Sequence, residues 1–179
     1  MNAYSLLAFG VIALAAGGAN AGDTSSPAQA ANGFYAAYAT FHPSDGIPDK
    51  AALAKYAPFI SPTLHRLLAE GDAAEIKFNK ANKDSPPLIE GDLFSSMFEG
   101  ATTYAIGACK SAAKTASCAV ALTYDDKHRP AKHWTDTVYL VMTPDGWRVG
   151  DIGYGGNWDF ANKGRLSATL RQVISDADG

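Results

Sequence analysis

Apolar side chains recur at helical spacing before residue 101 and alternate with polar ones, as in β-strands, after it. In the helical part, an aromatic stripe of Phe34, Tyr35, Tyr38 and Phe41 predicts a helix over 32–41 that Asn32 caps. A second, short helix is predicted over 49–56. It ends before Pro58, because proline cannot continue the hydrogen-bond ladder of a helix.

A third helix is predicted to begin at Ser61-Pro62, since serine caps a helix and proline suits its first turn. Its apolar side carries Leu64, Leu67 and Leu68, and Gly71 is a position where the helix could break. Residues 79–100 contain Pro and Gly but keep large apolar side chains, which indicates a structured loop rather than a linker.

The alternating part of the sequence predicts an antiparallel sheet followed by a helix. A tight turn at Pro144-Asp145-Gly146 separates the last two strands, and an amphipathic helix is expected over 163–175. The four predicted strands are 103–109, 118–124, 134–143 and 147–154. Helices, then antiparallel strands, then a helix indicate the α+β class. We therefore expect a single α+β domain over 32–179, with N-terminal helices packed on a curved four-stranded sheet.

The N-terminus has the pattern of a secretory signal peptide. An apolar run over 6–16, too short to cross a bilayer, is followed by small residues and an Ala19-Asn20-Ala21 cleavage site. We expect residues 1–21 to be removed, which leaves a flexible arm over 22–31 and a periplasmic or secreted protein. Because no Lys or Arg precedes the run, a retained membrane anchor or a buried helix is the alternative. No cysteine lies near the site, so a stable lipid anchor is not expected.

The net charge and the absence of known binding motifs argue against several classes of partner and cofactor. The formal net charge is −3 without a basic cluster, which argues against nucleic acid or an anionic membrane as a partner. The sequence lacks the phosphate loop, the dinucleotide fingerprint and the His-Glu-x-x-His helix, so no cofactor is expected. His128 and His133 lie in a predicted loop, while His42 and His65 lie in the helical region. These four histidines form no recognised metal pattern.

Cys109 and Cys118 are the only cysteines, and small or polar residues separate them between two predicted strands. An even cysteine count together with a secretory signal favours a cross-strand disulfide. Two free thiols or a redox pair are the alternatives.

Several short runs carry a resemblance to known families. Helices before a curved sheet, with a last strand Trp147-Arg148-Val149-Gly150-Asp151-Ile152-Gly153-Tyr154, resemble the cone-shaped nuclear transport factor 2-like superfamily. More narrowly, Tyr35 and Tyr38, Ser61-Pro62-Thr63-Leu64 and Gly91-Asp92-Leu93-Phe94-Ser95-Ser96 resemble an exported bacterial family, domain of unknown function 3828. The resemblance covers residues 31–175 and implies a periplasmic or lipoprotein module without an established catalytic set. This chain lacks the lipid-accepting cysteine of the lipoprotein members.

The superfamily also includes isomerases and dehydratases with polar residues inside the cone. On that hypothesis Asp92 or Asp151 would be a base whose pKa an apolar cone raises, and Tyr139, Tyr35 or Tyr38 would donate to a developing oxyanion. The alternative is structural, because a buried aspartate commonly accepts hydrogen bonds from backbone N–H groups. Asp92 in particular is placed to cap a turn.

Aromatic residues carry the binding prediction. The glycine-rich exit from the last strand puts Tyr154, Trp158 and Phe160 where a ring could contact a partner or close the open end of the cone. Tyr35, Tyr38 and His65, which lies beside the leucine stripe, are further candidate binding residues.

Two functions follow from these features. The leading hypothesis is a non-catalytic exported module that binds a protein or a cell-envelope component, for example as an immunity or accessory protein. A homodimer through the sheet is an option. The second hypothesis is a small isomerase-like enzyme or ligand carrier with a polar cavity inside the cone, for which fold alone is no evidence.

Overall fold

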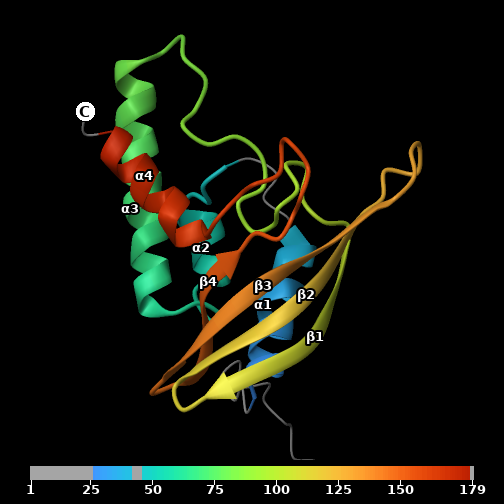
Figure 1. Cartoon of the computed structure of the whole chain (residues 1–179). Coiled ribbons are helices and arrows are strands. Elements are labelled where there is room, and N and C mark those ends of the chain that lie inside the picture. Colours follow the sequence, from blue (N-terminus) through green and yellow to red (C-terminus); the bar gives the residue numbers. More distant parts are fainter. Residues whose placement is uncertain (1–25, 42–45, 178–179) are drawn as a thin grey trace, which may run out of the picture.

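The computed structural model describes residues 26–41 and 46–177, and within them the chain is an α+β fold (Figure 1). Its helices are α1 (Pro27–Phe41), α2 (Lys50–Tyr56), α3 (Pro62–Ala81) and α4 (Leu166–Asp176). Its strands are β1 (Thr103–Ala112), β2 (Thr115–Tyr124), β3 (Lys132–Thr143) and β4 (Gly146–Gly153). The strands form one antiparallel sheet in the order β1-β2-β3-β4, the predicted meander. The predicted signal peptide lies outside the described residues.

Helix α1 begins at Pro27, before the predicted cap Asn32. The last part of the predicted flexible arm, residues 27–31, is therefore helical. Ser26 explains the difference, because its hydroxyl accepts a hydrogen bond from the Gln29 backbone N–H at 3.2 Å and proline suits the first turn. Ala30 and Ala31 are buried, which ties this start of the helix to the core.

Helix α3 runs through Gly71 without a break. A Cβ atom at this position would lie 3.2 Å from side-chain atoms of both Ile47 and Leu170, so the glycine lets α4 and the segment before α2 approach α3 closely. Among the described residues, no helix has both the length and the apolar content to span a membrane.

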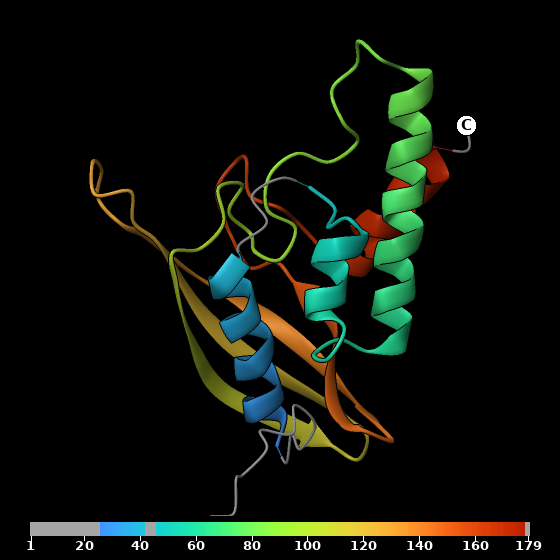
Figure 2. The ribbon, with the colours of Figure 1, turned by 180° about the vertical axis from the view of Figure 1, so that it is seen from behind.

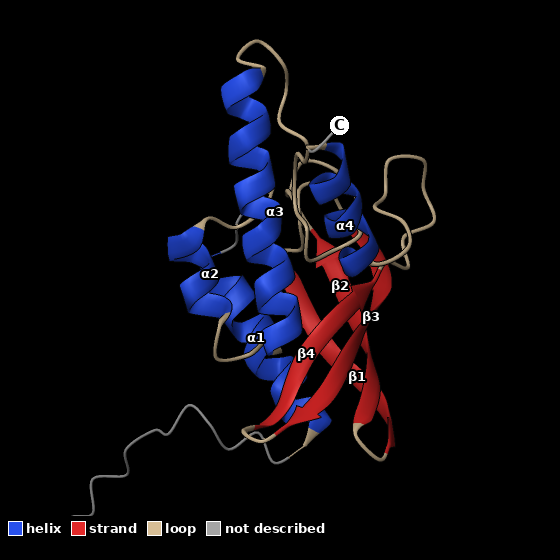
Figure 3. Cartoon of the chain, turned by 90° about the vertical axis from the view of Figure 1, so that its left-hand side faces the viewer, coloured by secondary structure: helices blue, strands red, loops and turns tan. Residues whose placement is uncertain are grey.

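Helix α1 lies against one face of the sheet, whereas α3 and α4 pack on each other beside the β4 edge (Figures 2 and 3). The sheet contributes alternate apolar residues to the core, such as Val138 on β3 and Ile152 on β4, which are fully buried. The helices and the loop before β1 add rings that pack on one another, among them Phe34, Tyr56 and Phe94. Burial of these large rings contributes to the stability of the fold together with the aliphatic side chains of the core.

Strands β1 and β2 are longer than predicted and continue to a tight turn at Ala113 and Lys114. Cys109 and Cys118 are opposite each other in the ladder and form the predicted disulfide. The bridge lies next to a β-bulge between Ile106 and Cys109, where the register of the two strands shifts. It therefore fixes the register of the edge strand beyond the bulge.

We expect the double variant Cys109→Ser/Cys118→Ser to fold but to lose about 2 to 3 kcal/mol of unfolding free energy, because the bridge closes a short loop in the unfolded chain. Urea unfolding followed by tryptophan fluorescence measures the loss. Wild-type protein kept reduced should unfold at the same urea concentration as the variant. Equal midpoints for the variant and the oxidised wild type would contradict the prediction.

Candidate functional site

A buried carboxylate, Asp136, organises the end of the sheet where β4 leaves it. Asp136 lies on the same face of β3 as Trp134 and Val138, and its exposed fraction is 0%. It accepts hydrogen bonds from the backbone N–H groups of Ser96 and Gly155, both at 2.8 Å. The Trp134 indole donates at 3.1 Å, and the Ser96 hydroxyl donates as well. One side chain therefore holds the loop before β1 and the loop after β4.

These two loops, 82–102 and 154–165, are also joined directly (Figure 2). The Asn162 side-chain amide donates to the backbone oxygens of Asp92 and Ser95, both at 2.8 Å. The Tyr154 hydroxyl donates to the Leu93 oxygen at 2.7 Å. The pair of loops therefore forms one ordered unit at this end of the sheet.

Asp92, a candidate base, is buried inside this unit. Its carboxylate accepts from the Phe94 backbone N–H and from the Tyr38 hydroxyl, both at 2.6 Å, and the Tyr38 oxygen accepts from the Ala101 N–H at 2.7 Å. Burial and the neighbouring Asp92 charge raise the pKa of Tyr38 far above its usual value, so the phenol stays protonated as the donor. This is the turn-capping role that the sequence offered as the alternative to catalysis.

Asp151 and Tyr139, the other catalytic candidates, are cross-strand partners on the sheet face opposite Val138 and Ile152. Asp151 accepts from the backbone N–H of Ser167 at 3.0 Å and from its hydroxyl at 2.8 Å. It thereby caps α4, because Arg165 at the N-cap makes no side-chain cap bond. Asp92 lies with Tyr38 and Asp151 lies opposite Tyr139, so each aspartate has a tyrosine nearby, but both carboxylates are engaged as caps.

Trp158 and Phe160, two predicted binding residues, lie together in a cleft of about 400 Å³ with Met97, Phe98, Glu99 and Lys132. The exposed fraction is 90% for Phe160 and 50% for Phe98. Trp158 is half-buried and packs edge to face against Trp134, with ring centres 5.8 Å apart. We call Met97, Phe98, Trp158 and Phe160 the aromatic surface. The two loops that Asp136 joins carry all four residues.

At two glycines the absence of a side chain lets a ring of the aromatic surface pack directly against the backbone. Gly91 has φ +76°, and a Cβ there would lie 2.5 Å from the Phe98 ring. A Cβ on Gly156 would lie 2.7 Å from the Trp158 ring and 2.8 Å from Ser96. The glycine-rich sequence therefore sets the positions of Phe98 and Trp158.

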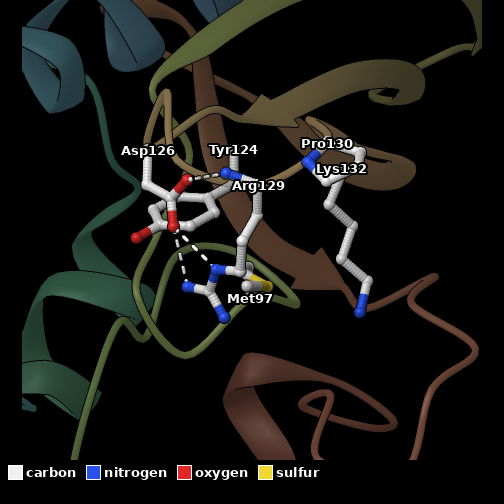
Figure 4. A pocket seen from close by; sticks show the side chains of 6 residues that line it. All are labelled: Met97, Tyr124, Asp126, Arg129, Pro130 and Lys132. Atoms are coloured by element: carbon white, nitrogen blue, oxygen red, sulfur yellow. Dashed lines mark hydrogen bonds and ion pairs between the residues drawn. The ribbon is translucent and has the colours of Figure 1, made fainter.

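Beside the aromatic surface lies a smaller pocket of about 150 Å³, which the β2–β3 loop closes (Figure 4). Arg129 pairs with Asp126 at 2.8 Å and is engaged within the loop. Hydrogen bonds from the His128 backbone and from Arg129 lower the pKa of Asp126, so this pair is charged at neutral pH. The Lys132 ammonium lies 3.9 Å above the Trp158 ring.

The remaining predicted binding residues do not join this surface. Tyr35 and Tyr38 are buried in the core and are not accessible to a partner. Tyr154 is half-buried and uses its hydroxyl within the protein. His65 lines a separate pocket with Pro144 and Arg148, next to the β3–β4 turn at the other end of β4. In the described part of the chain, no group of three or more His, Cys, Asp or Glu side chains could hold a metal ion.

Sequence reasoning missed Asp136, Asn162 and Phe98. A signal for Asp136 was present, because it occupies an inward position between Trp134 and Val138 in an alternating strand. A charged residue at such a position must be paired or hydrogen-bonded. No such pattern in the sequence points to Asn162 or Phe98, because their roles depend on contacts between two loops that are distant in the sequence.

We expect Asp136→Asn to lower the unfolding free energy by about 2 to 3 kcal/mol, because an amide cannot accept from every donor that the carboxylate satisfies. Hydrogen exchange of the Ser96 and Gly155 amides should become faster than in the wild type. Asp159→Asn is the matched control, since this exposed residue lies in one of the same loops. Equal stability and equal exchange in the two variants would contradict the role of Asp136.

Comparison of the chain with protein-family models, with characterised proteins and with solved structures found no match. The resemblance to the domain of unknown function 3828 family and to the nuclear transport factor 2-like superfamily therefore stays a prediction.

Proposed function

We propose that this protein is a non-catalytic exported module that binds a protein partner or a cell-envelope component through the aromatic surface. The observation that carries this proposal is the 90% exposure of Phe160 beside the half-exposed ring of Phe98. Large apolar side chains gathered on a surface expose area that water solvates poorly, and such patches commonly mark interaction sites. An immunity or accessory protein of the periplasm is one form of this function.

The position of Phe160 supports a role outside folding. Its ring is almost fully exposed, so it contributes little to the core, yet its neighbours Trp158 and Asn162 are held by packing and hydrogen bonds. A rigid frame that displays an apolar ring reduces the entropy lost when a partner binds. Hot spots of interfaces are enriched in aromatic residues for the same reason.

We further infer that the fold is a variant of the nuclear transport factor 2-like cone, with the aromatic surface at its open end. Helix α1 lying along one sheet face is consistent with this inference. The isomerase-like alternative has less support, because both aspartates are engaged as caps, Asp92 of a turn in the loop before β1 and Asp151 of α4.

We expect Phe160→Ala to lose its specific partner in affinity capture from periplasmic extract, with enrichment falling about tenfold or more, as for an aromatic hot spot. Isotope-labelled mass spectrometry compares the variant with the wild type. Met142→Ala is the matched control, because Met142 is 41% exposed near the β3–β4 turn, away from the aromatic surface.

Because Phe160 is so exposed, its variant should unfold at the same urea concentration as the wild type. Loss of capture then shows that the contact with the partner is lost, and not that the variant is unfolded. Capture of every partner to the same extent by the wild type, Phe160→Ala and Met142→Ala would overturn the proposed function.

A further inference from the structure

A groove of about 630 Å³, lined by both apolar and polar side chains, runs between α3 and the loop before β1. Ile76 of α3 is 61% exposed at this groove, and Phe98 forms part of the opposite wall. Its other apolar lining residues are Ile47, Pro87 and Ile89. The groove therefore exposes several apolar side chains which, like those of the aromatic surface, would be more stable when covered.

The charges of this groove have one sign. Asp72, Glu75 and Glu90 line it, and no Lys or Arg is among its lining residues. Burial raises the pKa of Asp72, and the nearby charge of Asp49 raises it further. Burial also raises the pKa of Glu75, although a hydrogen bond from the Ile89 backbone opposes the shift. Both carboxylates thus lie where their negative charge is disfavoured, and a cation would relieve that cost.

The groove is continuous with the aromatic surface, because Phe98 lines both. A chain segment that covers Phe160 and Phe98 needs only to continue past Phe98 to enter the groove. There it would meet Ile76 together with the carboxylates of Asp72 and Glu75. Charge complementarity thus specifies the chemistry of that continuation.

We propose that the groove receives the continuation of the partner segment bound at the aromatic surface, and that this continuation places a Lys or Arg beside apolar side chains. This inference rests on the proposed function and adds the chemical class of the partner, a protein segment that is apolar and basic. A neutral or acidic segment would leave the three carboxylates of the groove unpaired and partly desolvated.

The test uses two synthetic peptides that share one alternating Leu, Trp and Ser sequence and carry a pair of Lys or a pair of Glu residues at one end. Binding to the full chain is followed by fluorescence anisotropy. Nitrogen-15 chemical shifts then locate each peptide on the protein. We expect the lysine peptide to bind about three- to tenfold more tightly than the glutamate peptide and to shift the amides of Asp72 and Ile76.

The decisive variants are Asp72→Asn/Glu75→Gln and the control Glu70→Gln/Asp84→Asn, which removes the same net charge. Glu70 and Asp84 are exposed and do not line the groove. The first variant should lose the preference for lysine and the second should keep it. Because like charges are removed, the first variant should be no less stable than the wild type in urea.

Equal affinity of the two peptides for the wild type would overturn the inference, as would a lysine preference that survives Asp72→Asn/Glu75→Gln. Failure of the lysine peptide to shift the groove amides would overturn it as well. A second copy of this chain in the groove would appear as concentration-dependent dimerisation that the first variant abolishes, which also contradicts a separate partner. None of these results depends on Phe160→Ala, whose effect on partner capture tests the proposed function by itself.

Discussion

The hydrogen bonds that converge on the Asp136 carboxylate are the constraint on which the end of the molecule that carries the aromatic surface depends. A carboxylate withdrawn from water is costly unless donors surround it. Here the donors come from Ser96 before β1, Gly155 after β4 and Trp134 on the same strand. The cost of burying one charge is thus offset only when two loops, far apart in the sequence, are in place together. The two loops therefore become ordered together with the folding of the sheet.

The same principle explains the two aspartates that sequence reasoning considered for catalysis. Asp92 joins α1 to its loop through Tyr38, and Asp151 caps the first turn of α4 through Ser167. Each carboxylate replaces hydration with donors fixed by the fold, and Asp151 in addition satisfies an N–H group at the start of α4. Polar groups in this protein therefore serve as joints between elements.

The fold class and the meander were predictable because hydrophobic periodicity and turn residues are local signals. The disulfide was also predictable, since Cys109 and Cys118 flank one hairpin. Helix α1 begins before the predicted residue 32 because Ser26 caps it ahead of Pro27, as Ser61 caps α3 ahead of Pro62. Boundaries of this kind depend on a single capping hydrogen bond, which apolar periodicity does not report.

The candidate site was only half predictable. Trp158 and Phe160 stood out because large rings in a glycine-rich exit from a strand have few packing partners nearby in the sequence. Phe98 and the groove did not, because their neighbours come from α3 and are distant along the chain. Sequence composition counts charges but not where they gather, so a net charge of −3 does not reveal a groove whose charged lining residues are all carboxylates. The acidic groove and the exposed rings share Phe98, so the two patches adjoin, and the proposal of a single bound segment rests on this adjacency.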